Sequence, residues 1–191
     1  MILPIYAYGN PILRVKAKDV DPDEGFLKGL VSDMFETMKH ANGVGLAAPQ
    51  IGKSLRIFVV DASPFSQDES YSERERDFLY TFKRTFINPR IIEETGDEWN
   101  YEEGCLSIPN IREDISRQEL IKLNYRDEIG NSKTEVFKGI VARIIQHEYD
   151  HLEGILFTDK ISAFKRRVLK KKLENIQKGN IDNDFEMVFA K

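Results

Sequence analysis

The stretch at residues 140–154, IVARIIQHEYDHLEG, restricts the fold of this chain more than any other. His147 and His151 are four residues apart, and on a helix this spacing brings both side chains to one face, one turn apart. Two imidazoles so placed can bind a single metal ion, and Glu148 then faces a water on that ion rather than the ion itself. The stretch therefore predicts a helix that carries a metal centre.

The neighbours of the two histidines predict that this helix is buried. Apolar side chains surround most of its circumference: Ile140, Val141, Ile144, Ile145, Tyr149 and Leu152. Gly154 stands where a glycine commonly ends a helix. Imidazoles and a carboxylate are costly to bury without partners, and a metal ion would supply them. The alternative is a packed helix with a chance HExxH, which we disfavour because two of the chain's three histidines lie here.

Length and composition fit one globular domain covering residues 1–191. The hydrophobic content of 41% and charged content of 31% are ordinary for a soluble protein, and the net charge of −4 gives no sign of direct DNA binding. A single cysteine excludes an internal disulfide and fits a reducing compartment. No apolar stretch approaches the roughly 20 residues of a membrane span, and the N-terminus lacks a signal or transit pattern, so we expect a cytoplasmic protein.

The remaining elements predict an α+β fold. We expect an amphipathic N-terminal helix with Asp21 as N-cap and Pro22 as its first residue, ending at Asn42-Gly43. The expected strands are 55–61, 81–92, a short extended segment at 99–109, and a hairpin of 119–126 and 132–138. A basic helix follows at about 162–178. Helices and antiparallel strands occur in blocks without βαβ alternation, which indicates antiparallel sheets packed around the HEYDH helix.

Two segments are expected to lie outside this framework. Residues 62–79 are polar and rich in charge, which favours a surface insertion or a mobile loop. The segment 162–191 would form the C-terminal helix and a tail. Phe185, Val188 and Phe189 indicate that the tail packs on something, whereas the choice between an ordered strand and a free end is left open.

The glycine-rich stretch at 43–52, GVGLAAPQIG, formally matches the dinucleotide fingerprint G-x-G-x-x-A. We reject this interpretation because the fingerprint needs a strand before it and a helix opening inside it. Here a helix precedes, and Pro49 follows too soon. A loop whose small residues allow a backbone or substrate to approach fits better, and Gln50 offers an amide. Taken alone, the stretch could equally be a tight surface turn.

Two residues are candidates for a third metal ligand. Glu174 lies 23 residues after His151, about where a thermolysin-like zinc protease carries its glutamate ligand. Its surroundings are strongly basic, however, so pairing with neighbouring lysines is the better interpretation. Cys105 offers a thiolate, a strong ligand for iron, zinc or cobalt, and a Cys-His-His set leaves one position open for water.

Three motifs, GVGLAAPQ, EGCLS and QHEYDH, resemble in order and spacing the three signature segments of peptide deformylases. The similarity runs from near residue 4 to about 165, and the departures are the 62–79 segment and the tail after Lys178. The resemblance implies a hydrolase that removes the formyl group from the N-terminal formylmethionine of new proteins and releases formate. It implies that Cys105, His147 and His151 bind one divalent metal, most commonly Fe²⁺. Ligand types alone would have indicated Zn²⁺, and Ni²⁺ or Co²⁺ are further possibilities.

The resemblance also implies roles for residues around the metal. Glu148 would take a proton from the attacking water and deliver it to the leaving amine. The side-chain amide of Gln50 and the backbone N–H of Leu106 match the family's donors to the negative oxygen of the intermediate. Gly45 would let the substrate backbone approach, by strand-like pairing with the loop at 43–46.

Four other residues near the motifs are assigned to a substrate pocket or to the surroundings of the metal. Val44, Ile140 and Ile144 are proposed to line an apolar pocket for the formylmethionine side chain, with ordinary core packing as a nearly equal alternative. Asp150 is expected to pair with Arg112 or Arg117 beside the metal, or to lie at the surface.

The basic run Lys165–Lys172 is a candidate ribosome contact, because some bacterial deformylases dock through a basic C-terminal helix. A solvated helix face is the alternative. Two other functions stay open: a zinc peptidase with Glu174 as ligand, and a non-catalytic protein that binds a structural metal or a peptide. Glu148 argues against the second, since a structural site has no use for a carboxylate beside an open position.

Overall fold

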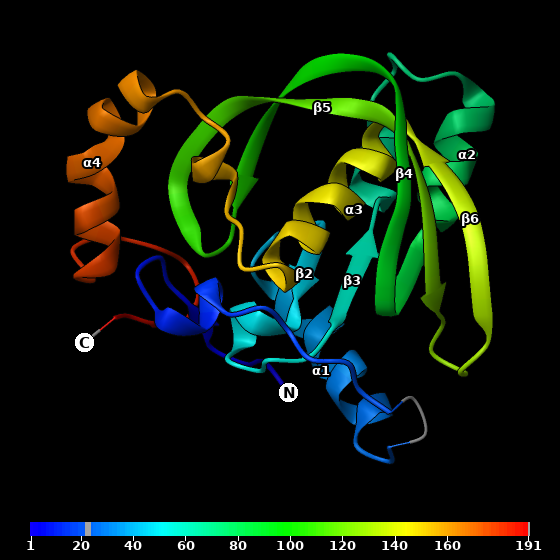
Figure 1. Cartoon of the computed structure of the whole chain (residues 1–191), viewed down its shortest axis with the longest axis horizontal. Helices are drawn as coiled ribbons and strands as arrows, with labels where there is room; N and C mark the ends of the chain where they lie inside the picture. The colour runs from blue at the N-terminus through cyan, green and yellow to red at the C-terminus, as the bar shows by residue number, and fades with distance from the viewer. Residues whose placement is uncertain (22–23, 191) are drawn as a thin grey trace.

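A computed structural model describes residues 1–21 and 24–190 of the chain. Its centre is a five-stranded antiparallel sheet in the order β2-β3-β4-β5-β6, which confirms the predicted α+β fold. The strands are β2 (Gly45–Ala47), β3 (Ile57–Asp61), β4 (Lys83–Cys105), β5 (Ile108–Arg126) and β6 (Ser132–Lys138). The sheet curls around the central helix α3 (Gly139–Leu152), as Figure 1 shows.

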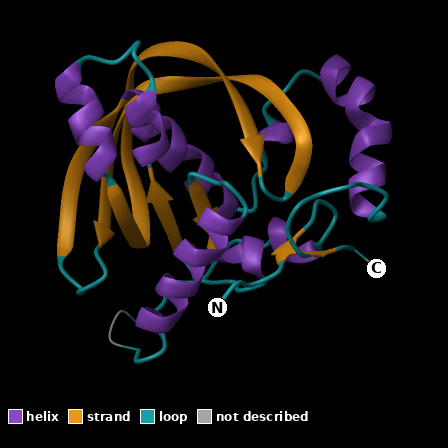
Figure 2. Ribbon diagram, turned by 180° about the vertical axis from the view of Figure 1, so that it is seen from behind, coloured by secondary structure: helices purple, strands orange, loops and turns teal. Residues whose placement is uncertain are grey.

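β4 and β5 form one long hairpin that arches over α3 (Figure 2). Its register partners run from Ile87 and Arg126 to Cys105 and Ile108, with four shifts along the way. Each shift adds local twist and bend, which lets so long a ribbon curve around a helix. The expected strand at 81–92 and the first part of the expected segment at 99–109 are thus parts of a single strand, β4, and the rest of that segment forms the turn at 106–107 and the start of β5. The polar residues between them hid this continuity, because that part of β4 is exposed.

α3 is buried along its length, as its sequence predicts. Eleven of its 14 residues are buried, including both histidines and Glu148. The helix ends at Leu152, and Gly154 follows with φ +73°. A Cβ at Gly154 would lie 2.6 Å from the backbone oxygen of Arg14, so glycine is needed here for both conformation and space.

The first helix begins later than predicted. α1 is Leu27–His40, and Phe26 precedes it without a side-chain cap, so the expectation that Asp21 is the N-cap is wrong. Pro22 lies outside the described residues. Gly25, a poor helix former, lies between Asp21 and Leu27, and Leu27 is the first buried residue of the helix. The predicted end is close to the observed one, because Asn42 has φ +55°.

The 62–79 segment is folded, so of the two alternatives expected for it, a surface insertion or a mobile loop, the structure rules against the loop. It contains the 3₁₀ helix η3 (Ser63–Gln67) and most of α2 (Glu73–Thr81). Ser72 and Glu75 cap α2 reciprocally, and Leu79 is the buried residue of this helix. The capping pattern was present in the sequence, but with so few buried residues the segment showed almost no apolar periodicity.

The C-terminal region returns to the N-terminal one. After the 3₁₀ turn η4 (Phe157–Asp159), α4 (Ala163–Gln177) begins with Ser162 as its N-cap, close to the predicted range. β7 (Met187–Val188) then pairs in parallel with β1 (Ile5–Tyr6), which resolves the tail as an ordered strand. The short helices η1 (Pro11–Arg14) and η2 (Ala48–Ile51) complete the framework. Within the described residues, no helix combines the length and apolarity needed to cross a membrane.

Candidate metal centre and its cavity

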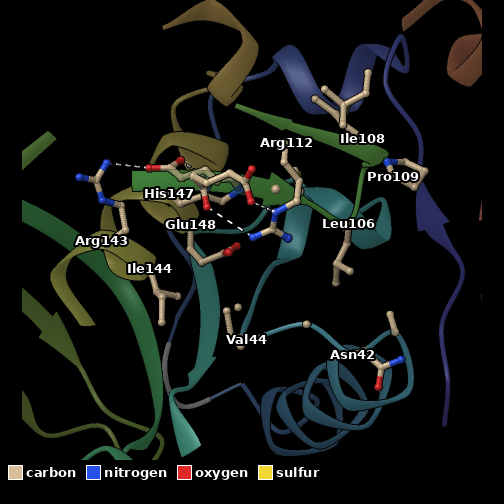
Figure 3. Close-up of a pocket in the computed structure, with 18 of the residues that line it drawn as sticks. Asn42, Val44, Leu106, Ile108, Pro109, Arg112, Arg143, Ile144, His147 and Glu148 are labelled. Carbon is tan, nitrogen blue, oxygen red and sulfur yellow. Dashed lines mark hydrogen bonds and ion pairs between the residues drawn. The ribbon is translucent and has the colours of Figure 1, made fainter. Parts of the chain in front are cut away.

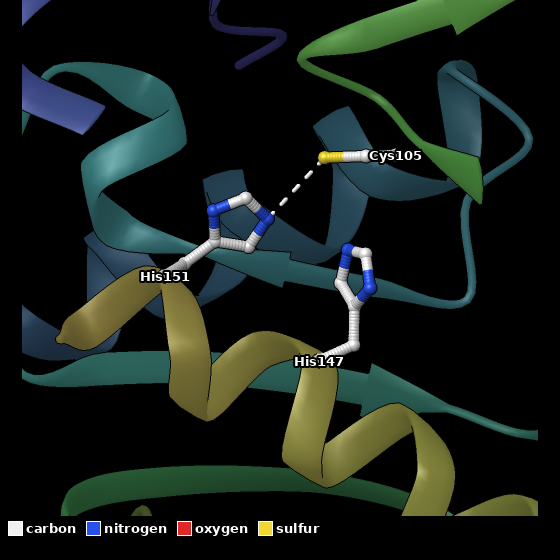
Figure 4. A group of neighbouring side chains, drawn as sticks. All are labelled: Cys105, His147 and His151. Atoms are coloured by element: carbon white, nitrogen blue, oxygen red, sulfur yellow. Dashed lines mark hydrogen bonds between the residues drawn. The ribbon is translucent and has the colours of Figure 1, made fainter. Parts of the chain in front are cut away.

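Cys105, His147 and His151 meet at one point between the end of β4 and the C-terminal half of α3 (Figure 4). Their potential ligand atoms all lie within 4.8 Å of one another. The Cys105 Sγ lies 3.3 Å from His151 Nε2, and the two imidazole ring centroids are 5.2 Å apart. One thiolate and two imidazoles at this spacing form a ligand set typical of Zn²⁺ or Fe²⁺.

Glu103 fixes the orientation of one of these imidazoles. His147 Nδ1 donates to Glu103 Oε2 at 2.9 Å, which leaves His147 Nε2 for a metal. Arg117 donates twice to the same carboxylate, at 2.6 and 2.9 Å, and Arg143 donates once at 3.0 Å. Burial opposes ionisation of Glu103, but the hydrogen bonds from Arg117 and His147 hold its pKa well below the usual range.

Glu103 and Arg143 are parts of the site that were not predicted from the sequence. Two signals could have found them. Glu103 is two residues before Cys105 on a strand, so both side chains share a face, and Arg143 is four residues before His147 on a helix. Arg143 is also held by the backbone oxygens of Ile115 at 2.8 Å and Trp99 at 2.6 Å.

Asp150 extends the hydrogen-bond network around Glu103. Of the two partners expected for Asp150, Arg112 and Arg117, the structure shows Arg117. Arg117 donates to Asp150 Oδ2 at 2.7 Å, and Lys160 Nζ lies 3.3 Å from the same oxygen. The alternative pairing with Arg112 is wrong, because Arg112 donates to Glu102 at 2.8 Å. Arg117 therefore bridges Asp150 and Glu103 behind the metal ligands.

Glu148 reaches from α3 toward β2, and Gly45 makes room for it. A Cβ at Gly45 would lie 2.4 Å from Glu148 Oε1. Burial raises the pKa of Glu148 to about 7, and a cation bound at the cluster would favour its ionised form. Glu148 Oε2 and His151 Nδ1 are buried without a hydrogen-bond partner among the described residues. A carboxylate oxygen without a partner beside a thiolate and two imidazoles fits a site built to hold a metal and water.

Gln50 is held so that its amide nitrogen faces the same cluster. Its Oε1 accepts the Ala47 N–H at 2.8 Å, and its Nε2 lies 3.6 Å from Cys105 Sγ and 3.3 Å from Ser107 Oγ. The side chain is buried in η2, directly after β2. Small residues in GVGLAAPQ thus bring an amide donor next to a metal ligand.

A cavity of about 490 Å³ opens beside the cluster (Figure 3). It is lined by nine of the residues singled out in the sequence: Val44, Gly45, Gln50, Cys105, Leu106, Ile140, Ile144, His147 and Glu148. Three further aromatic residues line the cavity that were not predicted to do so: Phe65, Tyr101 and Phe185. They come from the β3–β4 connection, the last part of β4 and the C-terminal tail, which are distant from the motifs in the sequence.

Glu174 does not belong to this site. It lies on α4, its side chain is about half exposed, and its carboxylate is 3.8 Å from Lys170 Nζ. The helix-surface pair expected as the alternative to a ligand role is therefore what the structure shows.

A family model and individual relatives of this chain both indicate the same protein family. The model of the family "Polypeptide deformylase" matches residues 2–167. The peptide deformylase of Christiangramia forsetii is 54% identical over 99% of this chain and 96% of its own length, and that of Flavobacterium johnsoniae is 53% identical over 100% and 97%.

Solved structures agree with these sequence matches. The crystal structure of a peptide deformylase from Legionella pneumophila superposes with a TM-score of 0.78 at 36% identity, covering 94% of this chain and 98% of that one. A Met-Ala-Ser-bound structure of a class I type b peptide deformylase from Acinetobacter baumannii gives 0.75 at 36% identity, covering 84% and 99%. With its Cys-His-His cluster, the chain belongs to the polypeptide deformylase family of metal-dependent enzymes.

Proposed function

We propose that this site hydrolyses the N-formyl group of N-terminal formylmethionine on newly made proteins, releasing formate. The observation that carries this proposal is the cluster of Cys105, His147 and His151 beside Glu148, in a chain of the deformylase family. The cavity beside this cluster has the apolar residues Val44, Ile140 and Ile144 in its lining. The Met-Ala-Ser bound to the Acinetobacter baumannii relative is the peptide that such a reaction leaves behind.

Cys105 Sγ and the Nε2 atoms of His147 and His151 would hold the metal, which we propose to be Fe²⁺, with Zn²⁺, Ni²⁺ or Co²⁺ as alternatives for the same ligands. Bound there, the cation supplies a lowered pKa for a water molecule and polarises the formyl carbonyl. The Glu103 carboxylate keeps His147 in the tautomer that a metal requires.

Glu148 serves as the proton carrier in this proposal. Its free Oε2 takes the proton from the attacking water and later delivers it to the leaving amine. The Gln50 amide and the Leu106 backbone N–H donate to the negative oxygen that develops on the formyl carbon. Losing one such donor typically costs about 10²–10³ in rate.

β2 positions the substrate chain in this proposal. It is the edge of the sheet, paired on one side with β3, so an extended peptide can add to its free side near Gly45. Val44, Ile140 and Ile144, which line the cavity, would receive the methionine side chain.

We also propose that the reaction takes place in the cytoplasm, with α4 contacting the ribosome through Lys165–Lys172. The helix displays cations over several turns, although Lys165 is already paired with Glu113 at 2.7 Å. Joint replacement of Lys170, Lys171 and Lys172 by Glu should weaken co-sedimentation with ribosomes at low salt. Unchanged co-sedimentation would rule this contact out.

The deciding experiment measures formate release from formyl-Met-Ala-Ser by protein purified without oxygen, with acetyl-Met-Ala-Ser as the control. Release from the formyl peptide alone supports the proposal, and metal analysis of the same sample identifies the ion. No release from protein carrying one metal per chain would overturn it. Cys105→Ser distinguishes the peptidase alternative, since metal binding should fail here and persist in a site that used Glu174.

A further inference from the structure

The connection between β3 and β4 is fixed at both ends. Asp61 and Lys83 are register partners, and the Ala62 N–H donates to the Phe82 backbone oxygen at 2.9 Å. Ser63 N–H donates to Asp61 Oδ1 at 3.0 Å, which sets the first turn of η3. The connection then returns through α2, which lies beside the start of α3 in both views (Figures 1 and 2). The connection at 62–82 is therefore an ordered segment and not a flexible loop.

Phe65 is the residue of this connection that lines the cavity. The side chain is half-buried, lines the cavity, and packs against the hydrophobic cluster that includes Ile140 and Ile144. The same stretch lies next to Tyr101, another lining residue. Burial raises the pKa of Tyr101, and the nearby Asp68 carboxylate adds to this while Arg112 opposes it. Tyr71 also packs against the cluster.

The position of Phe65 follows from the direction of α3. Ile140, Ile144 and Glu148 occupy successive turns of one helix face, about 6 Å apart along the axis. Glu148 marks the reacting end of the cavity, so Ile140 and the start of α3 mark the end away from it. Phe65 comes from the connection beside that start, lines the cavity and packs against the hydrophobic cluster that contains Ile140, so we assign it to this end of the cavity.

We propose that Phe65 sets the depth of the pocket for the first side chain of the substrate and thereby selects methionine over bulkier residues. This inference rests on the proposed deformylase activity. An apolar pocket distinguishes side chains that differ by one methylene by about 10–200-fold, so a single ring at its far end has a measurable effect. Phe65 is not one of the three potential metal ligands, so the role proposed for it is in specificity and not in catalysis.

The test compares kcat and KM of the metal-loaded enzyme for formyl-Met-Ala-Ser and formyl-Phe-Ala-Ser. In Phe65→Ala, the kcat/KM ratio of the Met over the Phe peptide should fall at least about tenfold, with a higher KM for the Met peptide and a nearly unchanged kcat. Phe65→Trp should raise the ratio. Because both substrates are measured on one preparation, the fraction of folded protein cancels from the ratio.

Phe78→Ala is the matched control. Phe78 lies on α2 of the same connection, with half of its side chain exposed and outside the cavity lining, so its ratio should match the wild type. Phe65→Leu carries the same test if the alanine variant does not fold. An unchanged ratio in active Phe65 variants overturns the inference, whereas a wild-type enzyme inactive on both peptides overturns the proposed function instead.

Discussion

At the scale of single residues, the site depends on side chains that hold its reacting groups in place. Glu103 accepts hydrogen bonds from His147, Arg117 and Arg143. Gly45 leaves the space that Glu148 fills. Neither residue is a metal ligand. Replacing either one should therefore have an effect that differs from the effect of removing a ligand.

Glu103→Gln should lower metal affinity by about 10–100-fold, because the amide no longer matches all three donors and the His147 ring loses its orientation. Competition with a chelator of known affinity measures this. Glu102→Gln is the control, since Glu102 is exposed and pairs only with Arg112 among the ion pairs of the described chain. Equal metal affinity of the Glu103→Gln and wild-type proteins would show that the hydrogen bond to His147 does not tune the site.

Gly45→Ala should reduce kcat while leaving the metal content unchanged. The new methyl group would lie 2.4 Å from Glu148 Oε1, so the carboxylate must move away from where its proton transfer is effective. We expect a loss of about 10²–10⁴ in kcat, the usual contribution of general acid–base catalysis. Gly29→Ala is a suitable control, because a Cβ at Gly29 meets nothing within 4 Å. Full activity of Gly45→Ala would mean that Glu148 can act from a second position.

At the scale of elements, α3 is anchored at its C-terminal end by an ion pair with a buried partner. Arg56, immediately before β3, has a side chain only 2% exposed and donates to Glu153 at 2.6 Å. It also donates to the Pro89 backbone oxygen at 3.0 Å. Since Glu153 follows His151 by two residues, this pair ties the metal-binding end of the helix to the sheet.

Glu153→Ala should destabilise the protein by up to about 3–5 kcal/mol, because it leaves the buried Arg56 charge with only the more distant Asp19 carboxylate, 3.8 Å from its Nε. Urea unfolding measures the loss. Lys16→Ala removes the other partner of Glu153. The Lys16 side chain is 72% exposed, so this change should lower the free energy of unfolding by no more than about 1 kcal/mol. Similar losses in the two variants would contradict the importance assigned to the buried partner.

The same pair predicts a pH dependence. Burial opposes ionisation of Glu153, but hydrogen bonds from Lys16 and Arg56 hold its pKa below the usual value of 4.5. A lowered pKa in the folded state means that the ion pair stabilises fully above pH 4.5 and less as the pH falls. The stability difference between wild type and Glu153→Ala should therefore shrink in acid. A difference that stays constant down to pH 3 would contradict this.

At the scale of the whole molecule, the metal cluster joins parts that are distant in the chain. Cys105 at the end of β4 meets His151 of α3, 46 residues later. The cavity is enclosed by still more distant parts, from Phe65 after β3 to Phe185 beside β7. An ion held by Cys105, His147 and His151 would therefore connect the hairpin to the central helix and would be coupled to folding.

Removal of the metal should lower the melting temperature. A ligand that binds only the folded state stabilises by RT ln(1 + [L]/Kd), about 2.7 kcal/mol at 100 times Kd. Calorimetry with and without a chelator measures the shift, and Cys105→Ser should melt at the same temperature in both conditions. A wild-type melting temperature that is insensitive to chelation would exclude a metal from this cluster.

Local spacing by itself determined the parts of this protein whose residues are close in sequence. His147 and His151 share a face because a helix has 3.6 residues per turn, and the hairpin of 119–126 and 132–138 follows from alternation around a turn. Gly154 ends α3 because its backbone conformation excludes other residues there. These features need no knowledge of the remaining chain.

Only the tertiary structure decided which segments that are distant in the sequence contact one another, and where the elements that depend on such contacts begin and end. The late start of α1, the folded 62–79 connection and the long β4 depend on burial and on strand register, which four shifts between β4 and β5 reset along the hairpin. Glu103 meets His147, and Phe65 reaches the cavity, only once the hairpin has curved over α3. Periodicity describes one element at a time, whereas contacts between elements depend on how the whole chain buries its apolar surface.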